Sequence, residues 1–366
     1  MQKKITYRIG DVSKIYSGGD RPEIYSDIQN SECPIPIYSN GLDNEGLYGY
    51  TNKSQIEGDC ITVAARGVNI GTVFYRPTPF LPIVRLLSVI PDRTLVNAKY
   101  LYYYFQIDTI IGTGSAQPQL TIPFFQKKKI LIHEDISYQQ KIASILSAYD
   151  KLIQNYKKQI EALQTVASEL YKEWFIRFRF PGWQNAKFEN GIPEGWKVEK
   201  LGTLANISTG KCNREDAEDD GIYPLFDRSQ EIKKSNEWIK DCEAIIVPGE
   251  GTSFIPRYYK GKFNLHQRCY CVEPKYPDFG KFLFYVLMLN RKYFLSVATG
   301  ATVPSLRYNN FASMKFILPE ISLCNNFNKI ADDIFAKVDN LQQQITNLTQ
   351  QRDLLLPRLM SGKLEV

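Results

Sequence analysis

The chain has 366 residues, of which 43% are apolar and 23% charged, and this composition excludes a disordered protein and predicts two or three globular domains. Its net charge of +6 is compatible with nucleic-acid binding but does not require it. Seven scattered cysteines, no apolar leader and no run of about 18 apolar residues predict a cytoplasmic protein with reduced thiols and no membrane span.

Residues 1–136 are predicted to form a mixed, β-rich domain. Short apolar runs such as Cys60–Ala64 and Thr72–Tyr75 alternate with turn-forming clusters of Asn, Asp, Ser and Gly. One helix is expected from Asn97 to Phe105, with Asn97 as its N-terminal cap.

A long helix is predicted over residues 137–180, with Ser137 as a candidate cap. Its apolar residues recur in alternating steps of four and three, which is the heptad pattern of a coiled coil. A helix of about 40 residues would be about 60 Å long, which suggests a spacer. The expected seam residues are Ile142, Leu146, Tyr149, Ile153, Tyr156, Ile160, Leu163, Leu170 and Trp174.

Residues 181–194 are predicted to be a linker, and residues 195–320 a second domain with a helix that starts near Phe279. A second long helix is expected over residues 321–366, and Pro357 should end or kink it. Its heptad seam includes the charged Arg352. The apolar seam residues are Ile334, Val338, Leu341, Ile345, Leu348, Leu355 and Leu359.

The second half of the chain repeats motifs of the first. Gly114–Leu120 resembles Gly300–Leu306, and Lys141–Ala143 returns as Lys329–Ala331. A repeat of about half the chain indicates a duplicated domain rather than a solenoid. We therefore predict an α/β (α+β) fold with two tandem β-rich domains, each followed by a long helix, the two helices packing as an antiparallel coiled coil. The alternative is that each helix pairs with another chain.

The sequence lacks the motifs of catalysis. Two histidines cannot supply a metal cluster or a Ser-His-Asp arrangement in both halves, and His266–Cys271 lacks a fourth metal ligand. No phosphate-binding loop, methyltransferase motif or dinucleotide loop is present. We predict a non-catalytic chain that holds no metal and no cofactor.

A duplicated domain suits a target with approximate two-fold symmetry, such as duplex DNA or a pair of identical subunits. Base readout uses Arg or Lys for guanine and Asn or Gln for adenine, and turns carry such residues here. The alternative for each is a solvated loop residue or a turn former. The candidate DNA-binding residues are Ser39, Asn40, Tyr48, Tyr50, Asn52, Lys53, Arg66, Asn69, Gln117 and Gln119 in the first half, and Asp227, Arg228, Ser229, Arg257, Tyr258, Tyr259, Lys260, Gln267, Arg268, Arg307, Tyr308 and Asn309 in the second.

Four segments resemble the specificity subunit of type I DNA restriction-modification enzymes over essentially the whole chain. Gly191–Gly202 is similar to the start of that family's second target-recognition domain, and Glu169–Phe175 to the end of its central helix. Leu355–Leu364 resembles its C-terminal signature, and Ser115–Leu120 the loop that closes each recognition domain.

This resemblance implies that each domain is a target-recognition domain that reads one half of a split, asymmetric double-stranded DNA site. It also implies that the helices set the spacing between the halves and dock two methyltransferase (M) subunits, which use S-adenosylmethionine. Restriction (R) subunits, which use ATP and Mg, complete the enzyme. One departure is that Ala301–Val303 replaces Ser115–Gln117, so a base contact by Gln117 has no obvious equivalent in the second half.

Two other functions stay open. A coiled-coil assembly scaffold would keep the helices without DNA specificity of its own, and a stand-alone nuclease would turn over DNA with a divalent metal. The resemblance also leaves open whether the host complex restricts DNA or only methylates it.

Overall fold

The structure is a computed structural model that describes residues 2–112 and 119–366. They form two compact units. Unit 1 comprises Met1–Lys157 and Gln343–Val366, and unit 2 comprises Lys158–Gln342. Each unit contains a β-rich domain and a segment of each of the two long helices. The predicted boundaries between domains, helices and linker stay a prediction. The two compact units divide the chain differently, because each unit includes the helix segments that contact its domain.

Helix α4 spans Ile136–Tyr171, and helix α9 spans Ile321–Ser361. Asp135, rather than Ser137, caps α4, because its Oδ1 accepts a hydrogen bond from the Ser137 backbone N–H at 2.8 Å. Pro357 lies inside α9, so the predicted alternative that it ends this helix is wrong.

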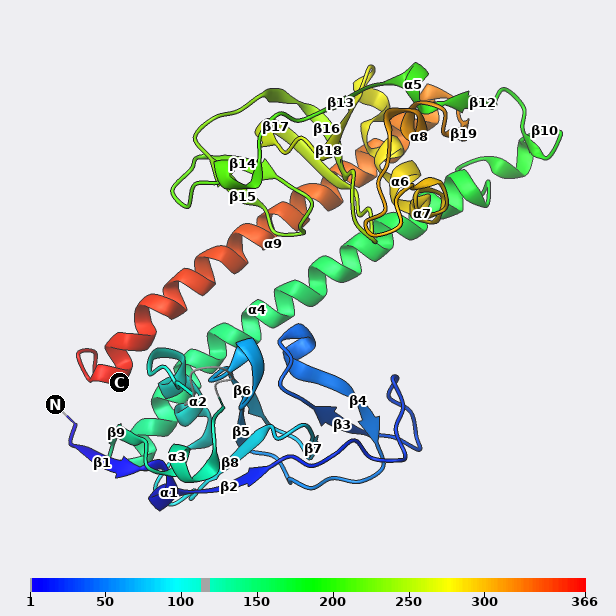
Figure 1. Ribbon diagram of the computed structural model, residues 1–366. Coiled ribbons are helices and arrows are strands. Elements are labelled where there is room, and N and C mark those ends of the chain that lie inside the picture. Colours follow the sequence, from blue (N-terminus) through cyan, green and yellow to red (C-terminus); the bar gives the residue numbers. More distant parts are fainter. Residues whose placement is uncertain (1, 113–118) are drawn as a thin grey trace. The chain divides into compact units, whose positions relative to one another are not determined.

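Unit 1 is built on a four-stranded antiparallel sheet in the order β2-β8-β5-β6, beside a three-stranded sheet, β4-β3-β7. Helix α2 contacts β5 and β6 (Figure 1). Asn97 caps α2 as predicted, because its Oδ1 accepts from the Tyr100 N–H at 3.0 Å. The elements are β1 (Lys4–Arg8), α1 (Ile9–Val12), β2 (Ser13–Ser17), β3 (Ile35–Tyr38), β4 (Leu47–Thr51), β5 (Cys60–Val63), β6 (Val73–Arg76), β7 (Leu81–Pro82), β8 (Leu87–Pro91), α2 (Ala98–Ile107), α3 (Ile122–Gln126) and β9 (Lys129–His133).

Unit 2 has a six-stranded sheet in the order β13-β18-β16-β17-β14-β15. Helix α6 contacts β16, β17 and β18 (Figure 1). The elements between the long helices are β10 (Phe188–Glu189), β11 (Ile192–Pro193), β12 (Lys197–Lys200), α5 (Leu201–Leu204), β13 (Ala205–Thr209), β14 (Tyr223–Phe226), β15 (Lys233–Ser235), β16 (Lys240–Pro248), β17 (Arg257–Leu265), β18 (Cys269–Pro274), α6 (Gly280–Leu289), α7 (Arg291–Val297), α8 (Tyr308–Ala312) and β19 (Lys315–Leu318).

The strand order confirms the duplication. The order β2-β8-β5-β6 in unit 1 corresponds to β13-β18-β16-β17 in unit 2. In each unit one further strand, β3 or β14, pairs in parallel with β7 or β17. The first and last strands of each domain also pair, β1 with β9 and β12 with β19. Residues at matching places in the two mixed α/β domains can therefore be compared directly.

In unit 1 the first part of α4 packs against the last part of α9. Ile142 and Leu146 share a hydrophobic core with Leu359, and each of the three is at most 1% exposed. Burial of one such side chain stabilises the fold by about 1.5–3 kcal/mol. An ion pair of 2.7 Å between Arg352 and Asp150 joins the same two helices.

In unit 2 the last part of α4, with the π-helical turn Lys172–Ile176 that follows it, packs against the first part of α9. The ring centroids of Tyr171 and Phe327 lie 5.9 Å apart, and those of Trp174 and Phe327 lie 6.1 Å apart. Because the first part of α4 contacts the last part of α9 in unit 1 and the reverse holds in unit 2, the helix pairing is antiparallel and is made within one chain.

All residues of the two predicted helix seams are buried or half-buried. All seven cysteines are free thiols. Within the described ranges, no helix is long and apolar enough to span a membrane, and no group of three His, Cys, Asp or Glu side chains could hold a metal ion.

Candidate nucleic-acid interface

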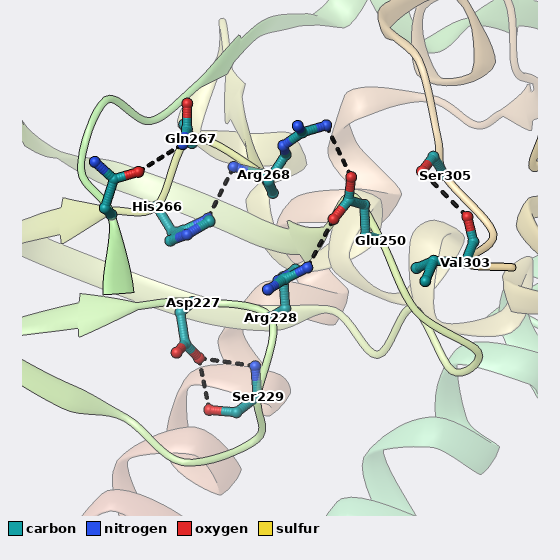
Figure 2. Close-up of polar contacts among 10 residues, drawn as sticks. Asp227, Arg228, Ser229, Glu250, His266, Gln267, Arg268, Val303 and Ser305 are labelled. Carbon is teal, nitrogen blue, oxygen red and sulfur yellow. Dashed lines mark hydrogen bonds and ion pairs between the residues drawn. The ribbon is translucent and has the colours of Figure 1, made fainter. Parts of the chain in front are cut away.

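Four segments of unit 2 meet at one end of its six-stranded sheet. Asp227–Ser229 follow β14, Gly249–Gly251 follow β16, and His266–Arg268 form the turn between β17 and β18. The loop between α7 and α8 closes the site, because a β-bridge joins its Ser305 to Glu250. Figure 2 shows the polar side chains of these segments gathered around Glu250.

A glycine lets the segment after β16 pass between its neighbours. The Gly249 N–H donates to the Arg268 carbonyl at 2.8 Å, and the Gly249 carbonyl accepts from the Leu306 N–H at 2.8 Å. A Cβ atom at Gly249 would lie 2.7 Å from the Arg268 carbonyl oxygen and 2.9 Å from the Tyr270 ring. Glycine therefore permits the close approach that places Glu250 in the middle of the site.

The Glu250 carboxylate binds two arginines that come from different segments. Its Oε2 accepts from Arg228 Nη1 at 2.7 Å, and its Oε1 accepts from Arg268 Nη1 at 2.8 Å (Figure 2). The Glu250 side chain is 14% exposed, whereas those of Arg228 and Arg268 are 47% and 53% exposed. A cavity of about 330 Å³ beside them is also lined by Arg214 and Val303. The site therefore presents two exposed guanidinium groups on a largely buried acid.

Asp227 and Arg257 form hydrogen bonds and an ion pair that fix the loop after β14. Asp227 is 5% exposed, and its carboxylate binds Lys233 at 2.7 Å and the Ser229 hydroxyl at 2.5 Å. Burial by itself would raise the pKa of Asp227, but these bonds from Lys233 and Ser229 outweigh it and lower the pKa to about 2. Arg257 donates to the carbonyls of Asp227 and Ser229 at 2.6 and 2.9 Å. Their polar groups hold the loop after β14 in place.

His266 and Gln267 hold the turn that carries Arg268. His266 is 6% exposed, and its Nδ1 accepts from the Arg268 backbone N–H at 3.0 Å. Burial, with a smaller contribution from the charge of Arg228, lowers the pKa of His266, which favours the neutral ring that can accept this bond. Gln267 is exposed, and its amide donates to the Asn213 side chain at 2.6 Å.

The matching end of the sheet in unit 1 has the same backbone frame with other side chains. A β-bridge joins Arg66 to Gln119, as one joins Glu250 to Ser305 in unit 2. Arg66 therefore stands where unit 2 has Glu250. Arg66 lines a cavity of about 270 Å³ together with Arg85 and Gln119. The two units thus offer different chemistry at equivalent positions.

Asn40 follows β3 as Arg228 follows β14, so these residues are counterparts. Both ends of the Asn40 amide bond the backbone: its Nδ2 donates to the Val84 carbonyl at 2.6 Å, and its Oδ1 accepts from the Ala65 N–H at 2.8 Å. Asn69 donates to the Asn40 carbonyl at 3.1 Å. The Asn40 amide therefore braces the loops, whereas the Arg228 side chain is about half exposed and binds Glu250.

Arg85 belongs to this surface although the sequence did not identify it. It is the counterpart of Arg268, because the turn that contains each residue closes with an N–H to carbonyl bond, Leu86 to Ile83 at 3.1 Å and Cys269 to His266 at 2.9 Å. Val84 and Arg85 have φ of 53° and 60°, which is uncommon for residues with a side chain and occurs often at functional sites. Aligning the two halves around Arg268 would have revealed Arg85.

The remaining candidates are spread over other places. Tyr258 lies on β17, donates to Glu243 at 2.6 Å, and with Tyr259 lines a separate cavity of about 760 Å³ in unit 2. Gln117 lies outside the described residues. Ser39 follows β3, Tyr48 and Tyr50 lie on β4, Asn52 and Lys53 are exposed after it, Lys260 is exposed on β17, and Arg307, Tyr308 and Asn309 are exposed at the start of α8. Contact of any candidate with DNA stays a prediction.

Comparison with known proteins gives a consistent result. A family model described as the type I restriction modification DNA specificity domain matches residues 1–165 and 193–353. The type I restriction enzyme MjaIX specificity subunit of Methanocaldococcus jannaschii is 28% identical over 345 residues, which cover 81% of this chain and 76% of that protein. The EcoDI specificity subunit of Escherichia coli is 31% identical over 177 residues, 47% of this chain and 39% of that protein.

The fold also resembles a solved structure. The crystal structure of the type I restriction-modification system S subunit from M. genitalium aligns with a TM-score of 0.67 at 18% identity, and the alignment covers 98% of this chain and 96% of that one. At this identity the likeness shows the fold alone.

Proposed function

We propose that this chain, a member of the family of type I restriction modification DNA specificity proteins, recognises an asymmetric DNA site in two halves, one half with each unit. The observation that carries the proposal is the repeated sheet end, where one backbone frame holds Asn40, Arg66 and Arg85 in unit 1 and Arg228, Glu250 and Arg268 in unit 2. Equal frames suit two turns of the same duplex, and unlike side chains suit unlike base sequences. The half-sites would then be separated by on the order of one helical turn, about 34 Å.

The chain itself contributes binding and no reaction in this proposal. Adenine methyltransferase subunits supply the methyl transfer with S-adenosylmethionine, and restriction subunits supply ATP- and Mg-dependent cleavage where the complex restricts DNA. Arginine contacts to phosphates would make the affinity strongly dependent on salt, and contacts to base edges would provide the specificity.

Two exposed apolar residues support docking of two methyltransferase subunits. Val166 on α4 and Leu354 on α9 are 57% and 71% exposed. They occupy matching positions, because each lies the same distance along the chain after its copy of the repeated motif, Lys141–Ala143 or Lys329–Ala331. Two identical partners need the same kind of contact on both helices, and this pair of exposed apolar residues recurs at matching positions.

Co-expression with the methyltransferase subunit of the same system, followed by single-molecule sequencing of host DNA, tests the recognition. We expect N6-methyladenine in a split, asymmetric motif that depends on both chains. Replacing residues 195–319 with a foreign recognition domain should change only one half of that motif. Methylation that is independent of this chain, or an unchanged motif after the exchange, would contradict the proposal and favour the assembly scaffold.

Native mass spectrometry of the complex tests the docking. Val166→Asp and Leu354→Asp should each remove one methyltransferase copy, since each introduces an unpaired charge into one contact, and the double variant should remove both. Ile28→Asp is the control, because Ile28 is 76% exposed in the segment between β2 and β3, which is not part of either long helix. Two copies retained in the double variant would exclude these docking positions.

A further inference from the structure

We infer that Arg228 and Arg268 read guanine in the half-site of unit 2, and that Glu250 is the positioning residue for both. The inference rests on the proposed function and adds the class of base that one recognition domain selects. It concerns the Arg228–Glu250–Arg268 cluster, whose members come from three segments that only the fold brings together (Figure 2).

The hydrogen bonds of the cluster leave donors available on both arginines. Each guanidinium uses Nη1 to bind one oxygen of Glu250, at 2.7 Å for Arg228 and 2.8 Å for Arg268. Among the described residues, none accepts a hydrogen bond from Nη2 or Nε of either arginine. Both side chains are about half exposed. Each arginine therefore presents an outward pair of donors whose orientation is set by the acid behind it.

Such a donor pair matches guanine better than the other bases. The major-groove edge of guanine carries two adjacent acceptors, O6 and N7, whereas adenine replaces one of them with an amino donor and cytosine presents a donor. An Arg fork makes two parallel bonds to an acceptor pair. Holding both arginines in place before binding reduces the side-chain entropy lost on binding. Two cations on one anion also leave a net positive charge, which DNA phosphates attract.

Asp227, His266 and Glu250 are less able than the two arginines to contact a base edge. Asp227 is 5% exposed and bonded to Lys233, and His266 is 6% exposed and bonded to the Arg268 N–H. The Glu250 side chain is 14% exposed and binds two more exposed guanidinium groups, so a cytosine amino group has little access to it. Gln267 and Arg214 are also exposed at this site, but the Gln267 amide donates to Asn213, and the bonds that orient a side chain on Glu250 are those of Arg228 and Arg268. The two arginines are therefore the exposed side chains that this site orients toward a base edge.

Unit 1 does not repeat the cluster. Its residues at the three matching places are Asn40, Arg66 and Arg85, which include no acid. The Asn40 amide is bonded to backbone at both ends. Arginine is common to the two units at one of these three places, where unit 1 has Arg85 and unit 2 has Arg268. The half-site of unit 2, read by two arginines bound to Glu250, should therefore require guanine more strictly than the half-site of unit 1.

The first experiment measures binding of the purified complex with methyltransferase subunits to duplexes that carry its methylation motif. We expect guanines in the unit 2 half-site, and a G·C to A·T change at a contacted guanine should weaken binding by roughly 5- to 140-fold. Replacing that guanine with 7-deazaguanine, which lacks N7, should weaken binding, whereas inosine, which lacks only the minor-groove amino group, should not. Arg228→Ala and Arg268→Ala should each remove the sensitivity to 7-deazaguanine at one guanine.

Glu250→Gln separates positioning from folding. The amide can accept from one arginine but turns its amino group toward the other, so discrimination should fall at both guanines together while the complex assembles and the unit 1 half-site is read as before. Arg93→Ala is the matched control: Arg93 forms an exposed 3.2 Å ion pair with Asp59 in unit 1 and should alter neither half-site.

The outcomes distinguish this inference from the proposed function. A split motif without guanine in the unit 2 half-site, or Arg228→Ala and Arg268→Ala complexes with unchanged base preferences at that half-site, would overturn the inference and leave the proposed function intact. A wild-type complex that methylates no split motif would remove both.

Discussion

Arg352 is the charged residue in the α9 seam, and its replacement tests how the helix pair is held in unit 1. Arg352 Nη1 donates to Asp150 Oδ1 at 2.7 Å, and the Tyr103 hydroxyl from α2 donates to Asp150 Oδ2 at 2.5 Å. Burial, and next the bond to Asp150, raise the pKa of Tyr103, so its hydroxyl stays protonated as a donor. Asp150 thereby joins α2, α4 and α9.

The expected cost follows from burial. The side chains of Arg352 and Asp150 are 27% and 25% exposed. Exposed ion pairs contribute up to about 1 kcal/mol, whereas removing one member of a buried pair costs about 3–5 kcal/mol. Because about three-quarters of each side chain is buried, the cost of breaking this pair should lie between these two values. Arg352→Met should therefore destabilise unit 1 by about 2 kcal/mol. For a unit of this size that corresponds to a fall in Tm of roughly 4–8 °C.

A double-mutant cycle with Asp150→Asn measures the interaction itself. Thermal unfolding followed by circular dichroism should give a coupling free energy of about 1–2 kcal/mol between Arg352 and Asp150. The Arg93 and Asp59 pair, 69% and 44% exposed, is the control and should couple by less than about 0.5 kcal/mol. Equal coupling in the two cycles would refute the assignment of Arg352 to the helix contact.

Three further predictions concern other parts of the chain. His133 is fully buried, and burial, with a smaller contribution from the charge of Lys4, lowers its pKa from 6.5 to about 4, so the unfolded chain binds the extra proton between these values. Stability should therefore decrease as the pH falls from about 6.5 to 4, and His133→Phe should flatten this dependence in urea titrations at each pH. Gly249→Ala should move the Arg268 carbonyl, because the added Cβ would lie 2.7 Å from it, and should lower unit 2 site discrimination more than complex stability; unchanged discrimination would contradict this. Leu359→Ala should cost about 2–5 kcal/mol in denaturant unfolding, because Leu359 is 1% exposed in the core of unit 1, and a loss under 1 kcal/mol would show that the end of α9 is not part of that core.

Local patterns were sufficient to predict the frame of the protein. The steps of four and three residues identify α4 and α9, because a helix that buries one face must repeat apolar residues at that period. Asn97 was identifiable as a cap because capping involves neighbours in the chain. The prediction of Ser137 as the cap of α4 was wrong. Asp135 and Ser137 are both residue types that cap helices, and only the backbone path decides between them.

The candidate site depends more on the fold, because its residues are adjacent only across strands. Arg257 and Asp227 are the polar types that bind DNA, yet they hydrogen-bond beneath the surface. Arg85 was missed because the apolar run before it, residues 80–84, contains no Gly, Asn, Asp or Ser to indicate a turn, and its left-handed conformation depends on the packing around it. Asn40 has the side chain of an adenine reader, but its amide braces two loops.

Sequence by itself determined that the chain is duplicated, that each half ends in a long heptad helix, and that known catalytic motifs are missing. These properties are written in residue types and spacings along the chain. Only the tertiary structure decided that Arg228, Glu250 and Arg268 form one cluster and that Arg352 meets Asp150. The reason is physical: such contacts depend on strand order and on how two distant helix segments pair, and one sequence pattern is compatible with many such pairings until packing of the whole core selects one.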